Sequence, residues 1–422
     1  KTLDAISAYL EQEQNEANSE ESDGEWEKEE QFDEETLEKA KELLRDPAFF
    51  YKLGLVLEKG FKIRKLGRVR FVVGEERNKR LLPLLLLARQ FTKVEGKPAT
   101  AKDSMVRLAL ELLRPAVSHI ERSYITPASL RYSNNLREAD ILYLPDSPEL
   151  RGELGRHLRF MRSDDAGLVA EYAVKSETGE MTTKVVKLPV KTIVTTSNAI
   201  TVDPALASGM WVMSTNDSSD LTRRVLEEKL KLRAGKRETC SDEELRVWKA
   251  AFAILAENWI PLDEISIPFA DKLLVLVGGD RSETRRNPDR LCDLVGIIAN
   301  ARQFQKPEDK RYEADVLDLF YALSLGLDAM QESFTTTNEK ERRILEVLQT
   351  SEKRWLTISE IAEKTHIEYN TVYHYLEKRL LARGYVVKSK EGGKNIYALV
   401  SDSETSETVS YTHLTLPTTE RV

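Results

Sequence analysis

The chain has 422 residues, of which 41% are hydrophobic and 32% charged, and its formal net charge is −8. This length predicts two or three domains, and the acidic balance excludes a uniformly basic nucleic-acid coat protein. Nucleic-acid contacts would therefore have to come from local patches. The two cysteines, Cys240 and Cys292, are too few and too far apart for a disulfide framework or a zinc site.

No apolar run approaches the roughly 20 residues that a membrane-spanning helix needs, and no signal peptide is visible. We therefore expect a cytoplasmic protein with no membrane partner. Residues 1–36 are rich in Glu, Gln, Asn and Ser, which predicts a disordered acidic linker. Because the chain begins with Lys1 rather than Met, an upstream domain or a separate partner with a replication activity stays open.

The middle of the chain alternates short apolar runs with helical patterns, which favours an α/β core. Two runs have the length and composition of buried parallel strands. A third segment predicts a hairpin around a Glu-Thr-Gly-Glu turn. The predicted strands are 68–73, 139–144 and 191–196, the hairpin is 168–190, and the predicted helices are 75–91 and 37–59, the latter broken at Asp46 and Pro47.

One loop has the spacing of a phosphate-binding motif. The pattern G-x-x-x-x-G-K-[ST] needs backbone N–H groups around the phosphates, a lysine for the β- and γ-phosphates, and a hydroxyl for Mg²⁺. Gly96 and Lys102 match this spacing, and the helical run MVRLALELL follows. We predict ATP and Mg²⁺ as ligands; the candidate nucleotide-binding residues are Gly96, Pro98, Thr100, Ala101, Lys102, Asp103 and Ser104.

Two positions depart from this motif. Ala101 replaces the second glycine, which is a mild change if the loop dihedrals stay in allowed space. Asp103 stands at the hydroxyl position, with Ser104 one residue later. A carboxylate repels phosphates unless Mg²⁺ lies between them, but aspartate is also a normal Mg²⁺ ligand. Asp103 and Ser104 are therefore candidate metal ligands, and the alternative is an ordinary loop-to-helix turn.

The order of the later motifs resembles AAA+ ATPases, in particular minichromosome-maintenance-like helicases of mobile elements. Residues 73–82 are similar to the G-x-E-x-x-K entry helix of that group. Residues 141–146 resemble the strand whose acids hold Mg²⁺ and polarise water, and Pro145 at one acid position leaves Asp146 as the candidate. Residues 193–198 resemble the strand that ends in the γ-phosphate sensor, which implies that Asn198 orients the attacking water.

The same resemblance implies a DNA-contacting hairpin and a helical lid. Lys184 and Lys187 are the basic residues of the hairpin that would line a central channel. Arg285 and Arg286 precede a helical run and resemble the second sensor of the lid, so they join Asp146 and Asn198 as candidate catalytic residues. The implied assembly is a homo-oligomeric ring. We therefore assign residues 37–218 to an AAA+-like P-loop core with N-terminal helices, and residues 219–335 to the helical lid region.

One departure from the AAA+ pattern affects the expected rate of ATP hydrolysis. Gly209 stands where relatives carry an arginine finger, which can contribute 10³–10⁵ in rate. Its absence predicts slow hydrolysis unless another arginine substitutes for it. The candidates for that substitution are Arg159, Arg162, Arg223 and Arg224.

Residues 336–402 resemble a winged helix-turn-helix domain. Thr357 and Glu360 form a capping-box pattern that predicts a helix start. In the next helix Val372, Leu376 and Leu380 repeat at the spacing of a buried face. Polar residues of the opposite face suit base edges and phosphates, and lysines of the following glycine-containing wing suit phosphates. The candidate DNA contacts are Asn370, Thr371, His374, Lys378, Lys388, Lys390 and Lys394.

The tail, residues 403–422, continues no earlier pattern. It resembles translated sequencing-adapter text, so we predict a disordered or artefactual segment. The leading functional interpretation is an ATP-dependent DNA motor or remodeller, an ATPase related to the replicative helicases of mobile elements. The alternatives are a catalytically degraded nucleotide-binding scaffold or loader, favoured by Asp103, Pro145 and Gly209, and a transcription regulator in which the core only oligomerises.

Overall fold

The computed structural model describes the chain from residue 31 to residue 399 with internal gaps. It divides into two compact units, Lys1–Ala270 with Asp289–Ser333, and Asp271–Pro288 with Phe334–Val422. No helix in the described parts is long and apolar enough to cross a membrane. The described ranges are 31–126, 129–130, 133, 136, 139–146, 152–163, 168–175, 181–188, 192–197, 209–216, 218–277, 287–334, 339–351, 353–381, 385–391 and 393–399.

The centre of the first unit is a five-stranded sheet with the strand order β4-β5-β8-β3-β9, in which every ladder is parallel. Leu144 lies beside Thr195, and Glu95 lies beside both Ser197 and Ser214. The carboxyl ends of these strands therefore meet at one edge. The strands are β3 (Thr92–Glu95), β4 (His119–Glu121), β5 (Ile141–Leu144), β8 (Thr192–Ser197) and β9 (Trp211–Ser214).

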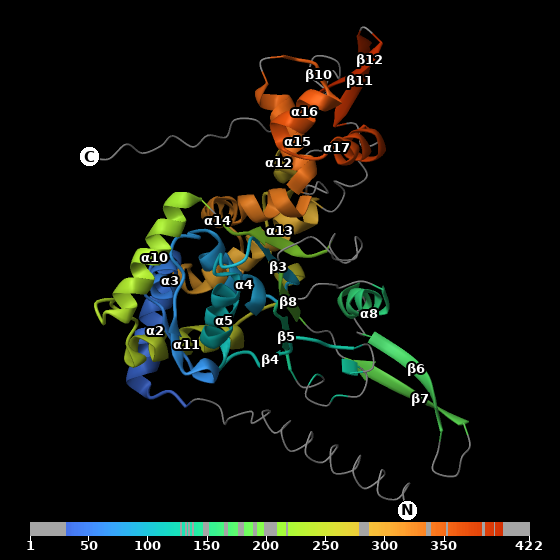
Figure 1. Cartoon of the computed structure of the whole chain (residues 1–422). Coiled ribbons are helices and arrows are strands. Elements are labelled where there is room, and N and C mark those ends of the chain that lie inside the picture. Colours follow the sequence, from blue (N-terminus) through green and yellow to red (C-terminus); the bar gives the residue numbers. More distant parts are fainter. Residues whose placement is uncertain are drawn as a thin grey trace, which may run out of the picture. The chain divides into compact units, whose positions relative to one another are not determined.

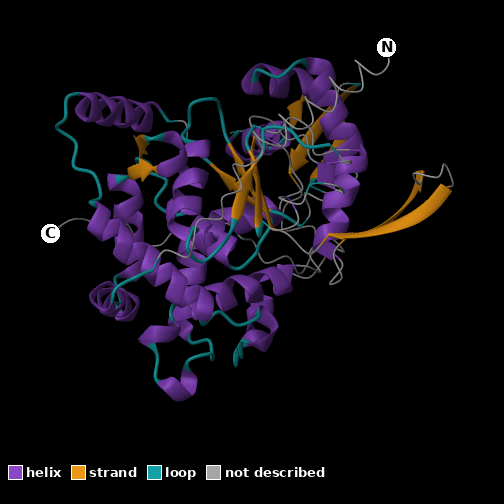
Figure 2. Ribbon diagram, turned by 90° about the horizontal axis from the view of Figure 1, so that it is seen from below, coloured by secondary structure: helices purple, strands orange, loops and turns teal. Residues whose placement is uncertain are grey.

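The sheet is buried because helices cover both of its faces, as Figure 2 shows. Every residue of β5 and β8 is buried. One apolar cluster against the sheet comprises Phe91, Ile125, Leu130, Leu136, Leu142, Leu144, Leu158, Ile193 and Met210. The surrounding helices are α2 (Glu34–Arg45), α3 (Phe49–Lys59), α4 (Asn78–Leu87), α5 (Lys102–Leu113), α8 (Gly152–Ser163), α10 (Ser219–Arg233), α11 (Asp242–Glu257), α13 (Asn287–Ala301) and α14 (Val316–Phe334).

The strand order makes the carboxyl end of β3 a topological switch point. The chain passes from β3 through α5 to β4 at one edge, and β8 then returns beside β3. The next strand, β9, lies on the other side of β3. Open α/β sheets bind their ligands in the crevice at such a point. The first unit is thus an α/β P-loop core whose loop follows the strand at the switch.

Two antiparallel hairpins accompany this sheet. The strands β6 (Leu168–Lys175) and β7 (Met181–Leu188) pair along their full length. They form a long ribbon that projects from the sheet in both views (Figures 1 and 2). The shorter hairpin, β1 (Phe61–Ile63) with β2 (Arg68–Arg70), precedes α4. The predicted hairpin at 168–190 is therefore confirmed at the level of the backbone.

Several element boundaries differ from the sequence predictions. The helix α2 begins at Glu34 and is capped by Asp33, so the last residues of the predicted linker are helical. Both elements that follow are shorter than predicted. The predicted strand 68–73 is β2 (Arg68–Arg70), and the predicted helix 75–91 is α4 (Asn78–Leu87). The strands β3, β4 and β9 were not predicted. The break expected at Asp46 and Pro47 does separate α2 from α3.

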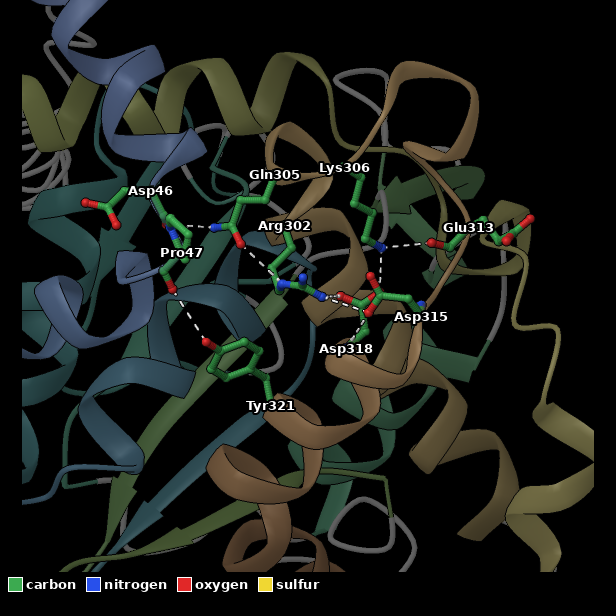
Figure 3. A network of polar contacts seen from close by, with 9 residues as sticks. All are labelled: Asp46, Pro47, Arg302, Gln305, Lys306, Glu313, Asp315, Asp318 and Tyr321. Carbon is green, nitrogen blue, oxygen red and sulfur yellow. Dashed lines mark hydrogen bonds and ion pairs between the residues drawn. The ribbon is translucent and has the colours of Figure 1, made fainter.

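A buried carboxylate organises the helical part of the first unit. Asp318, in the first turn of α14, has no exposed surface. Its Oδ1 accepts a hydrogen bond from Arg302 Nη1 at 2.5 Å, and its Oδ2 pairs with Lys306 Nζ. Asp315 accepts a second bond from Arg302 at 3.0 Å, as Figure 3 shows. Two cations thus compensate the burial of this charge, which would otherwise be costly.

The same network reaches the bend between α2 and α3. Gln305 Nε2 donates to the carbonyl of Asp46 at 3.0 Å, and its side-chain oxygen accepts from Arg302 Nε at 3.2 Å. The hydroxyl of Tyr321 donates to the carbonyl of Pro47 at 3.4 Å (Figure 3). Contacts far apart in sequence therefore fix the bend.

In the second unit, three helices pack on a three-stranded antiparallel sheet of order β10-β12-β11. Val372, Leu376 and Leu380 are fully buried, as the sequence spacing predicts. The elements are the short helix α12 (Leu274–Val277), α15 (Glu339–Thr350), β10 (Leu356–Thr357), α16 (Ile358–Thr365), α17 (Tyr369–Tyr375) with a π-turn over Leu376–Leu380, β11 (Val386–Glu391) and β12 (Lys394–Leu399).

The capping box at the start of α16 is present. The Glu360 amide donates to Thr357 Oγ1 at 3.3 Å, and the Thr357 amide donates to Glu360 Oε2 at 2.8 Å. Lys353 Nζ pairs with Glu360 Oε1 at 2.7 Å. The hydrogen bond from Lys353, followed by those from Thr357, lowers the pKa of Glu360 to about 2.

We expect Asp318→Asn to lower the free energy of unfolding by about 3–5 kcal/mol, because it leaves Lys306 without its carboxylate and Arg302 with Asp315 alone. Urea denaturation measures this change. Asp309→Asn is the matched control, since Asp309 is exposed in a short 3₁₀ turn nearby. A loss below about 1 kcal/mol for Asp318→Asn would contradict the assigned role.

We expect Glu360→Gln to destabilise α16 by about 0.5–1 kcal/mol at pH 7, because it removes the ion pair with Lys353 and a negative charge from the first helical turn, while the amide keeps the capping-box hydrogen bond. The pKa of Glu360 is depressed on folding, so its stabilisation is present above its ordinary value of 4.5 and declines as the pH falls towards 2. The difference between wild type and variant should therefore shrink below pH 4.5. Amide exchange in α16 measures it, with the exposed Glu363→Gln as control.

Candidate nucleotide site and nucleic-acid surface

The loop between β3 and α5 wraps around the start of a helix. It runs from Gly96 to Ala101, and α5 then continues for 12 residues from Lys102. Two non-glycine residues of the loop, Ala99 and Ala101, have left-handed backbones with φ of 69° and 63°. The first amides of a helix have no intrahelical acceptor, and the helix dipole makes this end favourable for an anion.

Gly96 is required by close packing of the loop against the end of β9. A Cβ at this position would lie 1.9 Å from Thr215 Oγ1 and 2.8 Å from Thr100 Oγ1. The hydroxyl of Thr215 itself bonds Thr100 Oγ1 at 2.7 Å and the Glu95 carbonyl at 3.1 Å. The strand β9, which the sequence did not predict, thus supports the loop.

Ala101 is under more strain than its sequence context suggests. Its φ of 63° and ψ of 12° lie in the left-handed region. An L-residue with a Cβ is disfavoured there by roughly 1–2 kcal/mol, a cost that glycine avoids. The replacement of the second glycine therefore carries this conformational cost, which the sequence alone does not reveal.

Lys102 places its ammonium inside the loop. The residue is 4% exposed, and its Nζ donates to the carbonyls of Gly96 at 2.7 Å and Lys97 at 3.1 Å. Burial lowers the pKa of Lys102, and the carboxylates of Asp146 and Asp103 oppose that shift. The ammonium and both predicted acids therefore lie close enough to interact.

Asp103 is tied to the ends of two strands. The hydroxyls of Tyr143 and Thr196 both donate to its Oδ1, each at 2.7 Å. Burial raises the pKa of Asp103, but these hydrogen bonds, with Arg107 and Lys102, outweigh it, so the net pKa is below the ordinary value. The group is an ionised carboxylate at neutral pH. Neither Tyr143 nor Thr196 was singled out from the sequence, because only the parallel pairing of β5 and β8 brings them together.

Asp146 lies two residues after the end of β5 and is exposed, with a left-handed φ of 49°. Its amide donates to Thr196 Oγ1 at 2.9 Å. Thr196 thus links the backbone of Asp146 to the carboxylate of Asp103. The structure brings Lys102, Asp103 and Asp146 together, and Ser104 follows on the first turn of α5.

A cavity of about 340 Å³ adjoins the loop. Its apolar walls come from the segment around β2 and from α10. Arg70 also lines it, and the Nε of that guanidinium is buried without a hydrogen-bond partner among the described residues. Arg70 was not predicted from the sequence, because its position depends on the β1-β2 hairpin. The lining residues include Val69, Arg70, Phe71, Val73, Thr100, Lys102, Asp103, Ser104, Arg107, Val225, Lys229 and Leu232.

These residues fit a nucleotide with Mg²⁺. Gly96 leaves room that any side chain would fill, and Lys102 and the start of α5 supply positive charge for phosphates. Asp103, Ser104 and Asp146 supply hard oxygen donors of the kind Mg²⁺ prefers. The adjoining cavity offers apolar walls for a base and a guanidinium for a polar group.

Residues of the predicted entry helix form hydrogen bonds with the end of β9 and with the chain just after it. Glu75 accepts from the Asn216 amide at 2.6 Å, and Asn78 Nδ2 donates to the Ser214 carbonyl at 2.7 Å. Lys79 is fully buried and pairs with Glu58 at 2.7 Å and with Glu76 at 2.9 Å. This segment therefore supports the strand that packs on the phosphate-binding loop.

Several predicted residues cannot be compared with the structure. Asn198, Arg285 and Arg286 lie outside the described residues. Lys184 and Lys187 belong to β7, where the structure describes their backbone but not their side chains. Gly209 is buried directly before β9.

The predicted DNA contacts in the second unit are exposed, except for one residue that is half-buried. Asn370, His374 and Lys378 are exposed, and Thr371 is half-buried. The exposed rings of Tyr369 and Tyr373 share this region and were not predicted. The remaining predicted contacts are Lys388 and Lys390 on β11 and Lys394 on β12.

The connection between β11 and β12 is shorter than the predicted wing. The sequence placed Lys388 to Lys394 in a connection, but β11 extends to Glu391 and β12 begins at Lys394. Lys388 Nζ pairs with Glu377 Oε1 at 2.5 Å, and Tyr397 donates to the same oxygen. Lys388 is therefore held by a neighbouring carboxylate, so Lys390 and Lys394 are the better-placed lysines for a phosphate.

No protein-family model and no curated protein sequence matches the chain. Among solved structures, it is similar to RuvB, the Holliday junction branch migration motor of Thermotoga maritima, at 15% identity and a TM-score of 0.27, covering 78% of this chain and 93% of that one. A candidate ATPase from Cytophaga hutchinsonii matches at 10% identity and a TM-score of 0.39, covering 72% and 97%. The JCV helicase matches at 11% identity and a TM-score of 0.27, covering 61% and 72%. Likenesses this low do not extend to function or assembly.

We expect Ala101→Gly to raise the free energy of unfolding by about 0.5–1 kcal/mol, because glycine relieves the left-handed strain. Thermal or urea unfolding measures the change. Ala109→Gly, in the interior of the same helix, is the control and should destabilise instead, by about 1 kcal/mol or more. Equal losses for the two variants would contradict the strained geometry.

Proposed function

We propose that the chain is an ATP-dependent DNA motor or remodeller built on an AAA+-type P-loop core. The observation that carries this proposal is the convergence of Lys102, Asp103 and Asp146 at the carboxyl edge of the sheet. An ammonium inside a glycine-initiated loop at a helix N-terminus suits phosphate binding. Two carboxylates beside it suit a divalent cation and an activated water.

In this proposal Lys102 leaves the carbonyls of Gly96 and Lys97 and pairs with the β- and γ-phosphates of ATP. Mg²⁺, when bound, would neutralise the charge that develops on the transferred phosphoryl group. Asp146, with Asp103 or Ser104, would supply the oxygen ligands of the metal. Asn198 orients the attacking water, and Arg285 or Arg286 contacts the nucleotide from the helical lid region.

The remaining parts of the proposal concern DNA. The second unit, with residues 336–402 as a winged helix domain, contacts DNA through the exposed face of α17 and through its β11-β12 hairpin. Lys184 and Lys187 on β7 add phosphate contacts, and a homo-oligomeric ring completes each site. A DNA replication role in a mobile element, together with a cytoplasmic location and an upstream or separate replication partner, belongs to the same proposal.

A catalytically degraded nucleotide-binding scaffold, loader or regulator is the second candidate. The strain at Ala101 favours it, because it raises the free energy of the loop geometry that phosphates need. Pro145 and Gly209, where relatives carry an acid and an arginine, favour it too. Turnover separates the two candidates, since both predict nucleotide binding.

We expect the purified chain to hydrolyse ATP and DNA to accelerate hydrolysis. Lys102→Ala should lower turnover by about 10²-fold or more, because a preorganised cation is lost from the phosphate site. Phosphate release measures the rate, with the exposed Lys97→Ala as the control within the same loop. Nucleotide binding that depends on Lys102 without turnover would favour the scaffold. Absence of any nucleotide binding would refute both candidates.

We expect Lys378→Ala to weaken DNA binding similarly for all DNA sequences. The slope of the logarithm of the affinity against the logarithm of the salt concentration should fall in magnitude by about one. Fluorescence anisotropy with labelled duplex DNA at several salt concentrations measures both. Lys340→Ala removes a positive charge from an exposed position of α15 and should change neither. Unchanged DNA affinity and DNA stimulation in Lys378→Ala would remove α17 from the interface.

A further inference from the structure

The magnesium site of a P-loop normally divides two kinds of oxygen ligand between two elements. The loop supplies a Ser or Thr hydroxyl, and a neighbouring strand supplies an aspartate. Here the hydroxyl position of the loop carries a carboxylate, and the strand side carries buried hydroxyls, with Asp146 after the end of β5. The carboxylate is Asp103 on α5, and the hydroxyls are Tyr143 on β5 and Thr196 on β8.

The hydrogen bonds leave the two oxygens of Asp103 in different situations. Both hydroxyls donate to Oδ1 at 2.7 Å, whereas Oδ2 accepts no hydrogen bond from the described part of the chain. Asp103 also lines the cavity beside the loop. One oxygen is therefore fixed by the strands, while the other keeps its lone pairs for a ligand in the cavity.

The hydroxyl partners are themselves held rigidly. Tyr143 and Thr196 are fully buried in adjacent parallel strands. The Thr196 oxygen also accepts the Asp146 amide at 2.9 Å, so this oxygen already has a donor and an acceptor within the protein. Neither hydroxyl is thus well suited to bind a metal directly, but both are suited to orient the carboxylate that does.

We propose that the ligand types of this metal site are exchanged: Asp103 is the principal carboxylate ligand of a nucleotide-bound Mg²⁺, and Tyr143 and Thr196 are positioning residues that fix its orientation. The proposal rests on the nucleotide binding proposed above. It accounts for Asp103 at the hydroxyl position and for Pro145 at the position of the strand acid. A carboxylate next to phosphates is repelled without a cation, so the exchange makes nucleotide affinity strongly dependent on Mg²⁺.

The test measures the affinity for a fluorescent ATP analogue with Mg²⁺ and with EDTA, and needs no turnover. The wild-type chain should bind about tenfold or more tightly with Mg²⁺. In Asp103→Asn the Mg²⁺ effect should fall to about threefold or less, while binding in EDTA is equal or tighter because the repulsion is gone. Asp220→Asn, which removes an exposed charge from the first turn of α10, should match the wild type.

Two further variants separate positioning from folding. Tyr143→Phe and Thr196→Val each remove one hydroxyl and should raise the Mg²⁺ concentration at half-maximal binding by about tenfold, as loss of an outer-shell partner does. Affinity in EDTA should stay near that of the wild type, which reports that the loop is folded. A purely structural defect would instead weaken both affinities together and would overturn the positioning role.

The outcomes distinguish this inference from the proposed function. If Asp103→Asn keeps the full Mg²⁺ effect and Asp146→Asn loses it, the metal carboxylate is the one after β5 and the exchange is overturned, while nucleotide binding stands. If the wild-type chain binds no nucleotide under either condition, the proposed function fails and the inference fails with it.

Discussion

The register of three parallel strands is the constraint on which the site depends. Pairing of Tyr143 with Val194 and of Leu144 with Thr195 aligns the ends of β5 and β8, and β3 ends at the same edge. Successive side chains of a strand point to opposite faces, so a slip of one residue would turn Thr196 away from α5. The ladder thereby decides which hydroxyls reach Asp103.

Strain and buried charge are concentrated where the loop meets the sheet. Ala99, Ala101 and Asp146 all have left-handed backbones, which residues with a Cβ adopt only when surrounding contacts hold them. Those contacts are specific: Thr215 packs on the loop from β9, and Thr196 receives the amide of Asp146. A loop held in this way keeps amides and an ammonium directed at one point before any ligand arrives. That preorganisation is what phosphate binding requires.

The amino-acid sequence by itself determined the local features of this protein. Helical periodicity and the Asp46-Pro47 break predicted α2 and α3, because a proline removes a helical donor wherever the chain places it. Apolar runs predicted β5 and β8, and the Thr357–Glu360 spacing predicted the capped start of α16. The spacing from Gly96 to Lys102 predicted the loop. Each of these signals lies within a few residues, where propensity and periodicity act.

Only the tertiary structure decided which residues meet. The strand β3 was not predicted because its sequence is polar. Its Lys93 is buried between β8 and β9, and the pairing with Glu95 at 2.5 Å compensates the buried charge. Likewise, Tyr143 and Thr196 converge on Asp103 because β5 and β8 are neighbours in space. In the chain, Tyr143 is 40 positions from Asp103 and Thr196 is 93 positions from it. Such contacts depend on strand order and register. Those are set by the burial of whole faces of the sheet, so no short stretch of sequence contains them.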